Sequence, residues 1–438
     1  MRYMDMRQSR GSVIAAIAVF FIATVFQFAA LPPADAHGGG FVTTGGHHIN
    51  TPPPVTPAPA NNVRNFGAVG DGTTDDSTAI QNAANDAANR HIGVFFPAGT
   101  YLHFSPLFFN GVAVSGVGST SVLISNNPTN CAVFLTGSGP SIQKMVISTQ
   151  GIEADSDQND PQLSTLAIFN ATSWTVAHCT IVQGTNTWGV FAFQSTVGAI
   201  TANVFDGTGN ANDVAIVANI CTNITASSNL TQNEAVGFTA QGSLFIAVLS
   251  NTFGNVTFPT LQFAIEPISV INCTIAQNTI QMANSNGGTA AIATFFCDNT
   301  FVQSNDTWGG FDGIIVYGAG SGTNVVSQNT IHNTGLQGIT AANEANSAVQ
   351  IMSNTFGECG LLATQPDPFF INAVILVEGL SPPSSDASGA TTIVQNNSYQ
   401  GHVNGLSTLV TSTFTAPHIP AANVTGNTPT QTALGNHI

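Results

Sequence analysis

The residues best suited to chemistry in this sequence are three carboxylic acids in its second half, Glu266, Asp312 and Glu344. Each follows a recurring Asn-Thr-Phe or Asn-Thr-Ile triplet by 13 to 15 residues. If these triplets mark equivalent positions of stacked coils, Asp312 and Glu344 lie on adjacent coils, ~5 Å apart, and Glu266 lies two coils before Asp312. Retaining glycosidases hold two carboxyls ~5–5.5 Å apart, and inverting ones ~6.5–9.5 Å apart. The spacing predicts two-carboxylate catalysis on a sugar, with turn-forming or solvated acids as the alternative.

Two similar segments carry a tryptophan. GTNTWGVF surrounds Trp188, and SNDTWGGFDG surrounds Trp308, 120 residues later. An exposed Trp ring can stack on a sugar ring, whereas a buried one fills core. Asp306 and two glycines flank Trp308, which favours a position in a loop. We therefore predict that Trp308, Asp306 and Trp188 bind a substrate, with core packing as the alternative. His332 could act as a base, or be a hydrogen-bonded structural residue.

A short acidic run is a candidate metal site. Asp155, Asp157 and Asp160 lie in the segment EADSDQND. Alternating oxygen ligands are typical of a calcium loop, although Asp160 or Pro161 stands where such a loop has glycine. The run predicts either a weak Ca²⁺ site or a solvated loop, and no other cofactor is expected.

The distribution of charge limits the class of partner. The chain has only six Lys and Arg residues in 438, and none follows Lys144. Its last 294 positions therefore cannot neutralise phosphates, which excludes nucleic-acid binding. The formal net charge of −16 would also repel acidic polysaccharides unless a cation intervenes. The expected partner is a neutral polysaccharide.

The N-terminus is typical of a secretory signal. Three arginines precede an apolar run over residues 13–28, and Ala34-Asp35-Ala36 offers a cleavage site between small residues. Removal of residues 1–36 would leave a formal charge of −17 and a Pro-, Gly- and His-rich linker over residues 37–62. We predict a secreted or cell-surface protein, possible also in a periplasm, with no membrane insertion after cleavage. An uncleaved membrane anchor is the alternative, because the apolar run is long for a signal.

The body of the chain is repetitive. The triplet or a close relative recurs, with a mean spacing of 25 residues, at Cys179, Asn203, Asn229, Asn251, Cys273, Asn299, Asn329 and Asn354. A period of this size predicts a stacked solenoid, and the β-branched and aromatic residues make its coils β. An inward Asn at one position of each coil can bond its copies above and below. Residues 359–392 break the period, as either two short coils or one coil with a long loop insertion.

The six cysteines form no C-x-x-C pair and no zinc pattern. Export would permit disulfides, but we favour buried free thiols in the interior of the solenoid.

The segment 63–104 combines a glycine-rich loop, GAVGDGTTDD, with an alanine-rich helix near 76–90 and a short strand in FFPAGTYL. Asp75 or Asp76 can cap this helix. The segment resembles the N-terminal part of the pectate-lyase-like family, which includes rhamnogalacturonase-like and epimerase-like proteins. The resemblance implies a right-handed parallel β-helix with a helix over its open end. We therefore predict an all-β fold over residues 63–438, a single-stranded right-handed parallel β-helix of ~25-residue coils with an N-terminal capping α-helix.

The resemblance does not select one activity, because the family includes lyases, hydrolases, epimerases and tailspike-like binders. The arginine base of the lyases has no counterpart in the body of this chain, and the Gly-His-Gly and Arg-x-Lys motifs of polygalacturonases are absent. The Asp-Pro-His element of the epimerases is replaced at Asp160-Pro161-Gln162 and Asp367-Pro368-Phe369. We predict a polysaccharide-active protein, a glycosidase rather than an arginine-based lyase. The alternative is a non-catalytic glycan-binding or adhesive β-helix.

Overall fold

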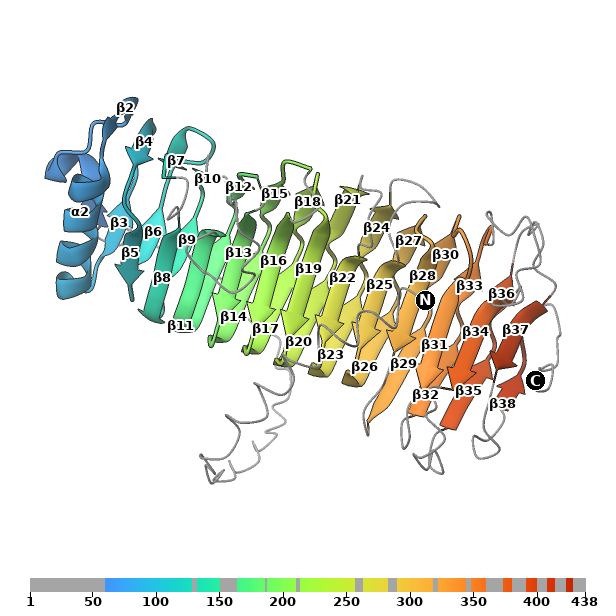
Figure 1. Cartoon of the computed structure of the whole chain (residues 1–438). Coiled ribbons are helices and arrows are strands. Elements are labelled where there is room, and N and C mark those ends of the chain that lie inside the picture. The colour runs from blue at the N-terminus through green and yellow to red at the C-terminus, as the bar shows by residue number, and fades with distance from the viewer. Residues whose placement is uncertain are drawn as a thin grey trace, which may run out of the picture. The chain divides into compact units, whose positions relative to one another are not determined.

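The computed structural model shows a stack of parallel strands (Figure 1). It describes residues 60–127, 132–149, 164–185, 187–209, 213–256, 263–282, 290–317, 322–343, 348–359, 373–379, 391–399, 408–413 and 423–427. Every strand pairing in these ranges is parallel, and each strand pairs with its equivalents on the coils before and after it. The predicted parallel β-helix is confirmed. The 3-10 helix η1 (Val63–Phe66) follows the first strand of the stack, and the helix α2 (Ser77–Arg90) follows the second.

Each coil contributes one strand to each of three ribbons. Ribbon 1 consists of β5 (Leu107–Asn110), β8 (Val133–Ser138), the first part of β11 (Ser164–Ala177), β13 (Trp188–Phe193), β16 (Val214–Asn219), β19 (Val236–Gln241), β22 (Phe263–Ile268), β25 (Ala290–Phe295), β28 (Asp312–Tyr317), β31 (Ile339–Asn343), β34 (Ala373–Gly379) and β37 (Thr408–Thr413). Ribbon 2 consists of β1 (Ala60–Asn62), β3 (Gly93–Phe95), β6 (Ala113–Ser115), β9 (Ser141–Gln143), the last part of β11, β14 (Thr196–Thr201), β17 (Thr222–Ser227), β20 (Leu244–Leu249), β23 (Ile271–Ala276), β26 (Asp298–Gln303), β29 (Thr323–Ser327), β32 (Ala348–Met352), β35 (Thr391–Gln395) and β38 (Asn423–Thr425).

Ribbon 3 forms a separate sheet. It consists of β2 (Asp71–Asp75), β4 (Gly99–His103), β7 (Ser121–Ser125), β10 (Val146–Thr149), β12 (Thr180–Val182), β15 (Val204–Asp206), β18 (Leu230–Gln232), β21 (Thr252–Val256), β24 (Thr279–Met282), β27 (Asp306–Trp308), β30 (Thr330–His332), β33 (Thr355–Phe356) and β36 (Ser398–Tyr399). Alternate side chains of all three ribbons point inward and form one continuous core. In ribbon 3, for example, Phe205, Phe253 and Phe356 lie at the same inward position and are fully buried.

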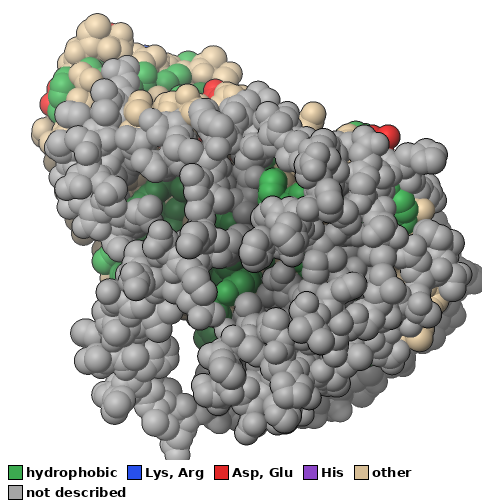
Figure 2. Space-filling model, turned by 45° about the vertical axis from the view of Figure 1, so that its right-hand side comes forward, with side chains coloured by type: hydrophobic (Ala, Val, Ile, Leu, Met, Phe, Trp, Pro, Cys, Tyr) green, Lys and Arg blue, Asp and Glu red, His purple; other side chains and the backbone are tan. Residues whose placement is uncertain are grey.

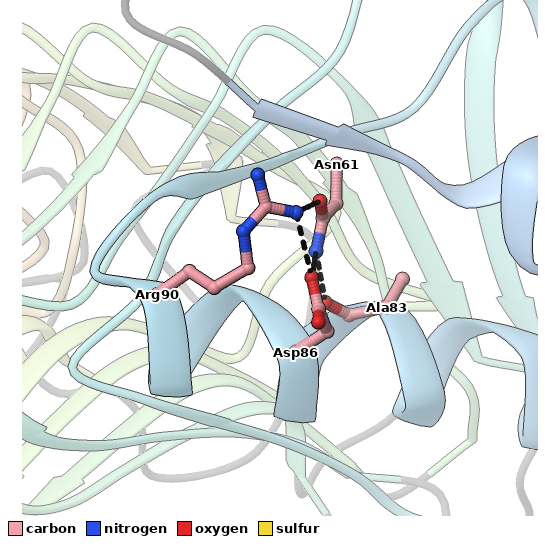
Figure 3. A network of polar contacts seen from close by, with 4 residues as sticks. All are labelled: Asn61, Ala83, Asp86 and Arg90. Atoms are coloured by element: carbon pink, nitrogen blue, oxygen red, sulfur yellow. Dashed lines mark hydrogen bonds and ion pairs between the residues drawn. The ribbon is translucent and has the colours of Figure 1, made fainter.

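The capping helix α2 presents a narrow face of small residues to the first coil, as predicted. Ile80, Ala83, Ala84 and Ala87 on this face are buried. A polar network beside this face fixes the helix to β1 (Figure 3). Asn61 Nδ2 donates to the carbonyl oxygen of Ala83 at 3.0 Å and to the carboxylate of Asp86 at 2.9 Å. The helix thus covers the first strands, whose backbone groups would otherwise meet water.

The carboxylates before the helix have different roles. Asp76 is the N-cap residue but makes no capping bond; its two oxygens accept the backbone N–H groups of Val69 and Gly70 instead. The neighbouring Asp75 accepts the backbone N–H of Ser77 at 3.0 Å. Of the two predicted caps, therefore, Asp75 satisfies the helix and Asp76 closes the glycine-rich loop.

A ladder of buried amides connects the coils at the corner between ribbons 2 and 3. Its members are Cys179, Asn203, Asn229, Asn251, Asn278, Asn305, Asn329, Asn354, Asn397 and Asn427. The Oδ1 atom of each Asn accepts the backbone N–H of the previous member, and its Nδ2 atom donates to a carbonyl of the previous coil at 2.9–3.1 Å. The predicted ladder is present in most coils.

Two predicted members of the ladder are wrong. Cys273 is a core residue of β23, and Asn299 is an exposed residue of β26 whose Nδ2 atom donates to Asn272. The true members on these coils are Asn278 and Asn305. The error arises because ribbon 2 contains the same polar–Thr–apolar pattern as the ladder corner.

The irregular segment after Cys359 lies between two consecutive ladder members. The backbone N–H of Asn354 donates to Oδ1 of Asn397 at 2.9 Å, so these residues are consecutive ladder members, 43 residues apart. The strand β34 lies within the interval and pairs with β31. Between the two ladder residues, the described residues contribute one strand to ribbon 1, β34, and one to ribbon 2, β35.

The buried thiols form hydrogen bonds in the same way as serine hydroxyls at the corner between ribbons 1 and 2. Cys221 Sγ donates to the carbonyls of Ala192 at 3.4 Å and Asn219 at 3.3 Å. One coil away in either direction, Ser195 and Ser243 donate to the equivalent carbonyls. Among the described residues all cysteines are free and buried, in agreement with the prediction: Cys179, Cys221, Cys273, Cys297 and Cys359.

We expect Asn278→Ala to lower the free energy of unfolding by ~3 kcal/mol or more, because it leaves the buried N–H of Asn251 and the carbonyl of Val248 without partners. Urea unfolding followed by circular dichroism measures the change. Asn82→Ala, on the exposed side of α2, is the control and should alter stability by less than ~0.5 kcal/mol. Equal effects of the two substitutions would contradict a stabilising ladder.

We also expect the five described thiols to resist alkylation at about pH 8, because the thiolate is the reactive form. Burial raises the pKa of Cys179 and of Cys297 to about 12, and that of Cys221 and of Cys359 to about 11. Peptide mass spectrometry should find these positions unmodified in the folded protein and modified in denaturant. Rapid labelling of any one of them in the folded state would contradict this account.

Candidate functional site

Two of the predicted catalytic acids face outward on ribbon 1 but do not lie side by side. Through Ala290, Asp312 is in register with Phe263, the first residue of β22. Glu266 lies three residues further along that strand, beside Thr239. The two carboxylates are thus offset by two strands, ~10 Å, and by three residues along the strand, another ~10 Å. This separation exceeds that of either class of two-carboxylate glycosidase.

Asp312 is a buried residue with a structural hydrogen bond. It is 7% exposed, and its Oδ1 atom accepts the backbone N–H of Gln337, the residue opposite it on the next coil, at 3.1 Å. Glu344 lies outside the described residues. The alignment of Asp312 with Glu344 depended on Asn299 as a ladder member, and the true member is Asn305. Asp312 follows this ladder residue by seven positions, whereas Glu344 follows Asn329 by 15.

Ribbon 3 brings Asp306, Trp308 and His332 together on its outer surface, and we call this group the Trp308 cluster. The rings of Trp308 and His332 stack with their centroids 4.5 Å apart and an interplanar angle of 27°. His332 Nε2 lies 3.5 Å from Asp306 Oδ1. His332 covers one face of the indole ring, and Trp308 is still 44% exposed. Of the predicted ligand-binding residues, Trp308 and Asp306 are therefore adjacent and accessible.

Glycine on the following coil makes room for the cluster. A Cβ atom at Gly357 would lie 2.6 Å from Nδ1 of His332, which is far below a normal contact distance. On the other side of the cluster, Gln281 of β24 is in register with Trp308. The stack thus has a fixed place along ribbon 3, between a long polar side chain and a glycine.

Trp188 is not equivalent to Trp308. It is only 9% exposed and stacks on Phe191 with a centroid separation of 4.8 Å. Trp188 begins a strand of ribbon 1, whereas Trp308 ends a strand of ribbon 3. The similar segments around them therefore occupy different positions of the coil, and core packing is the role the structure gives to Trp188.

The contact between Trp308 and His332 was not predicted from the sequence. The spacing from the ladder could have predicted it, because Trp308 follows Asn305 by three residues and His332 follows Asn329 by three residues. Residues at the same distance from consecutive ladder positions lie side by side. The signal was hidden as long as Asn299 was taken for the ladder residue.

The predicted calcium ligands Asp155, Asp157 and Asp160 lie outside the described residues. Within the part of the chain that the structure describes, no three His, Cys, Asp or Glu side chains are grouped as metal ligands.

The comparison with protein families decides the affiliation of the chain. Residues 60–290 match the family described as rhamnogalacturonase A/epimerase, pectate lyase-like, which is more than half of the sequence. The chain belongs to this family. The family match begins at β1 and includes the capping helix, in agreement with the resemblance found in segment 63–104. None of the curated proteins compared with the chain matches it in sequence.

Several solved structures are similar to this member of the family. The A-module of mannuronan C-5 epimerase AlgE6 from Azotobacter vinelandii is 17% identical, with a TM-score of 0.46, over 84% of this chain and 100% of that one. The surface adhesin PfbA of Streptococcus pneumoniae is 13% identical, with a TM-score of 0.49, over 82% and 91%. The catalytic unit of an alpha-1,3-glucanase from Streptomyces thermodiastaticus is 14% identical, with a TM-score of 0.43, over 81% and 70%.

In the described ranges, no helix has the length and apolar character needed to cross a bilayer. The predicted signal over residues 1–36 lies outside these ranges.

We expect collisional quenching by acrylamide to detect one accessible tryptophan among three. Trp174 is 1% exposed and Trp188 is 9% exposed, against 44% for Trp308. Trp308→Phe should remove the strongly quenched part of the fluorescence, and the control Trp188→Phe should leave it. Strong quenching that persists in Trp308→Phe would show that the indole ring of Trp308 is not the accessible one.

Proposed function

We propose that this protein is an exported β-helix that binds a neutral extracellular polysaccharide at the Trp308 cluster. The observation that carries the proposal is an exposed indole ring held in place by the imidazole of His332 on a rigid strand. An aromatic ring fixed before binding loses little conformational entropy when a sugar packs against it. The carboxylate of Asp306 and the imidazole of His332 offer an acceptor and a donor for hydroxyl groups beside the ring.

The charge of the chain supports a neutral ligand. On the one face that Figure 2 shows, the coloured side chains are mainly hydrophobic or uncharged, and acidic groups lie at separate places. The chain carries a formal charge of −16 and no Lys or Arg after Lys144, so its overall field repels a polyanion. Membership in a family described by a rhamnogalacturonase and an epimerase supports a carbohydrate as the ligand class. Export rests on the N-terminal signal predicted from residues 1–36.

Hydrolysis of such a polysaccharide is the second candidate function. It is favoured by the outward orientation of Glu266 and Asp312 on ribbon 1, with Glu344 as the third predicted acid. The buried carboxylate of Asp312 and its bond to the backbone of Gln337 favour a structural role for this residue. Binding is therefore the function that we place first.

We expect Trp308→Ala to weaken binding of neutral oligosaccharides by ~10-fold or more, equivalent to ~1.4 kcal/mol, because the stacking surface is lost. A glycan array identifies the ligand, and isothermal titration calorimetry then measures the affinities. The matched control is Leu230→Ala, which removes an exposed apolar side chain from the same ribbon and should leave affinity unchanged. Unchanged affinity in Trp308→Ala would place the binding site elsewhere.

The same glycans, incubated with the wild-type protein and assayed for new reducing ends or unsaturated products, separate binding from catalysis. Binding without products agrees with the first proposal. If reducing ends form, Asp312→Asn and Glu344→Gln test the predicted catalytic pair at unchanged melting temperature. Full activity in both variants would exclude this pair.

A further inference from the structure

Three consecutive coils meet at Gly207, at the corner between ribbons 3 and 1. Gln183 follows β12, Gly207 follows β15, and Glu234 lies shortly after β18. The backbone N–H of Gln183 donates to the backbone carbonyl of Asp206 at 3.1 Å, and the backbone N–H of Gly207 donates to that of Gln232 at 3.1 Å. A Cβ atom at Gly207 would lie 2.9 Å from both Cδ and Oε2 of Glu234. The carboxyl group of Glu234 thus fills the space that the missing side chain of Gly207 leaves.

If Glu234 is ionised, the side chains of Gln183 and Glu234 have more hydrogen-bond acceptors than donors. Glu234 is 1% exposed and Gln183 is 4% exposed. Gln183 Nε2 donates to the carbonyls of Thr187 at 2.8 Å and Val214 at 3.0 Å, which uses both of its hydrogens. These two bonds fix the orientation of the amide. The remaining atoms, Gln183 Oε1 and both carboxyl oxygens of Glu234, are all acceptors, and none has a hydrogen-bond donor among the described residues.

The neighbouring acids have donors, in contrast to Glu234. Asp213 Oδ2 accepts the backbone N–H of Thr208 at 2.8 Å and its hydroxyl at 2.6 Å. Asp206 Oδ1 accepts the side-chain amide of Asn233 at 2.9 Å. Burial, together with the charges of Asp213 and Asp206, raises the pKa of Glu234 well above its usual value. The sequence has no Lys or Arg after position 144 that could neutralise a third charge here.

We propose that Glu234 is a neutral carboxylic acid in the folded protein and donates its O–H to Oε1 of Gln183. One proton then supplies the missing donor and removes a buried charge. The bond connects the coil of β12 to the coil of β18 across Gly207, which makes it a proton-dependent clasp between three coils.

The clasp predicts a definite dependence of stability on pH. A carboxyl whose pKa is higher in the folded than in the unfolded state stabilises the fold fully below the unfolded pKa. This contribution is lost as the pH rises through the folded pKa, because ionisation then places a charge beside Asp213 and Asp206. The contribution of Glu234 to stability is thus larger in mildly acidic surroundings than in alkaline ones.

Thermal unfolding of the full chain between about pH 5 and pH 9 tests the clasp. The melting temperature of the wild type should fall relative to that of Glu234→Gln as the pH rises, and this difference excludes the opposite contribution of the buried His103, whose pKa burial lowers. Glu234→Gln places an amide where the neutral acid stood, and this amide can donate to Gln183 Oε1 at every pH. Its melting temperature should fall distinctly less and exceed that of the wild type at alkaline pH. The control Glu358→Gln makes the same chemical change at an exposed position and should follow the wild type.

Two results would overturn the proposal. The first is a Glu234→Gln variant with the same pH dependence as the wild type, or one destabilised at alkaline pH. The second is a wild-type melting temperature at neutral pH that rises with added Ca²⁺ and falls with chelator while Glu234→Gln does not respond, since the carboxyl would then be an ionised cation ligand. The infrared absorption of a protonated carboxyl in the wild type, absent from Glu234→Gln and unaffected by Glu358→Gln, would support the proposal directly.

Discussion

The constraint on which the structure depends is the hydrogen bonding of one side-chain amide to the next coil. At the corner between ribbons 2 and 3, each ladder Asn accepts a backbone N–H and donates to a backbone carbonyl, so that the corner is satisfied without water. The residue before each ladder Asn, such as Ala202, Ser228 or Gln328, has a positive φ of 54–67°. Each corner is therefore a two-residue turn of nearly the same geometry. This regularity fixes the start of every strand of ribbon 3 and keeps the three ribbons in register.

The corner between ribbons 2 and 3 is regular, whereas the corner between ribbons 3 and 1 varies in length. The corner between ribbons 3 and 1 has three residues after β18, seven after β15 and six after β30. Glu234 lies in one such corner, the Trp308 cluster lies just before another, and Asp312 directly follows it. Functional residues tend to lie on variable segments held by a rigid scaffold. In this protein the scaffold is the ladder, and the variable corners hold the side chains with unusual environments.

The scarcity of basic residues shapes the electrostatics of these corners. In most proteins a buried acid is paired with Lys or Arg, but this chain has neither after Lys144. Its buried acids must be satisfied by backbone and hydroxyl donors, as for Asp213, or by a proton, as we infer for Glu234. The same lack of Lys and Arg is one reason why we propose a neutral ligand.

The sequence by itself determined the class of fold. The loop-helix-strand segment 63–104 and a repeat near 25 residues were sufficient for the parallel β-helix, because each pattern depends on local chemistry: small residues on one helical face and an Asn at each turn. Burial of the thiols was predictable for the same reason, since the interior of a solenoid takes small apolar residues.

Register was decided only by the tertiary structure. Ribbons 2 and 3 both alternate polar and apolar residues with the same period, so the sequence cannot tell Asn299 in a ribbon 2 strand from Asn305 in the ladder corner. That ambiguity misaligned Asp312 and concealed the contact of Trp308 with His332. Trp188 and Trp308, similar in sequence, likewise occupy different ribbons. Contacts between coils depend on corner lengths, which are set by how neighbouring turns pack, and a single chain read in order does not contain that information.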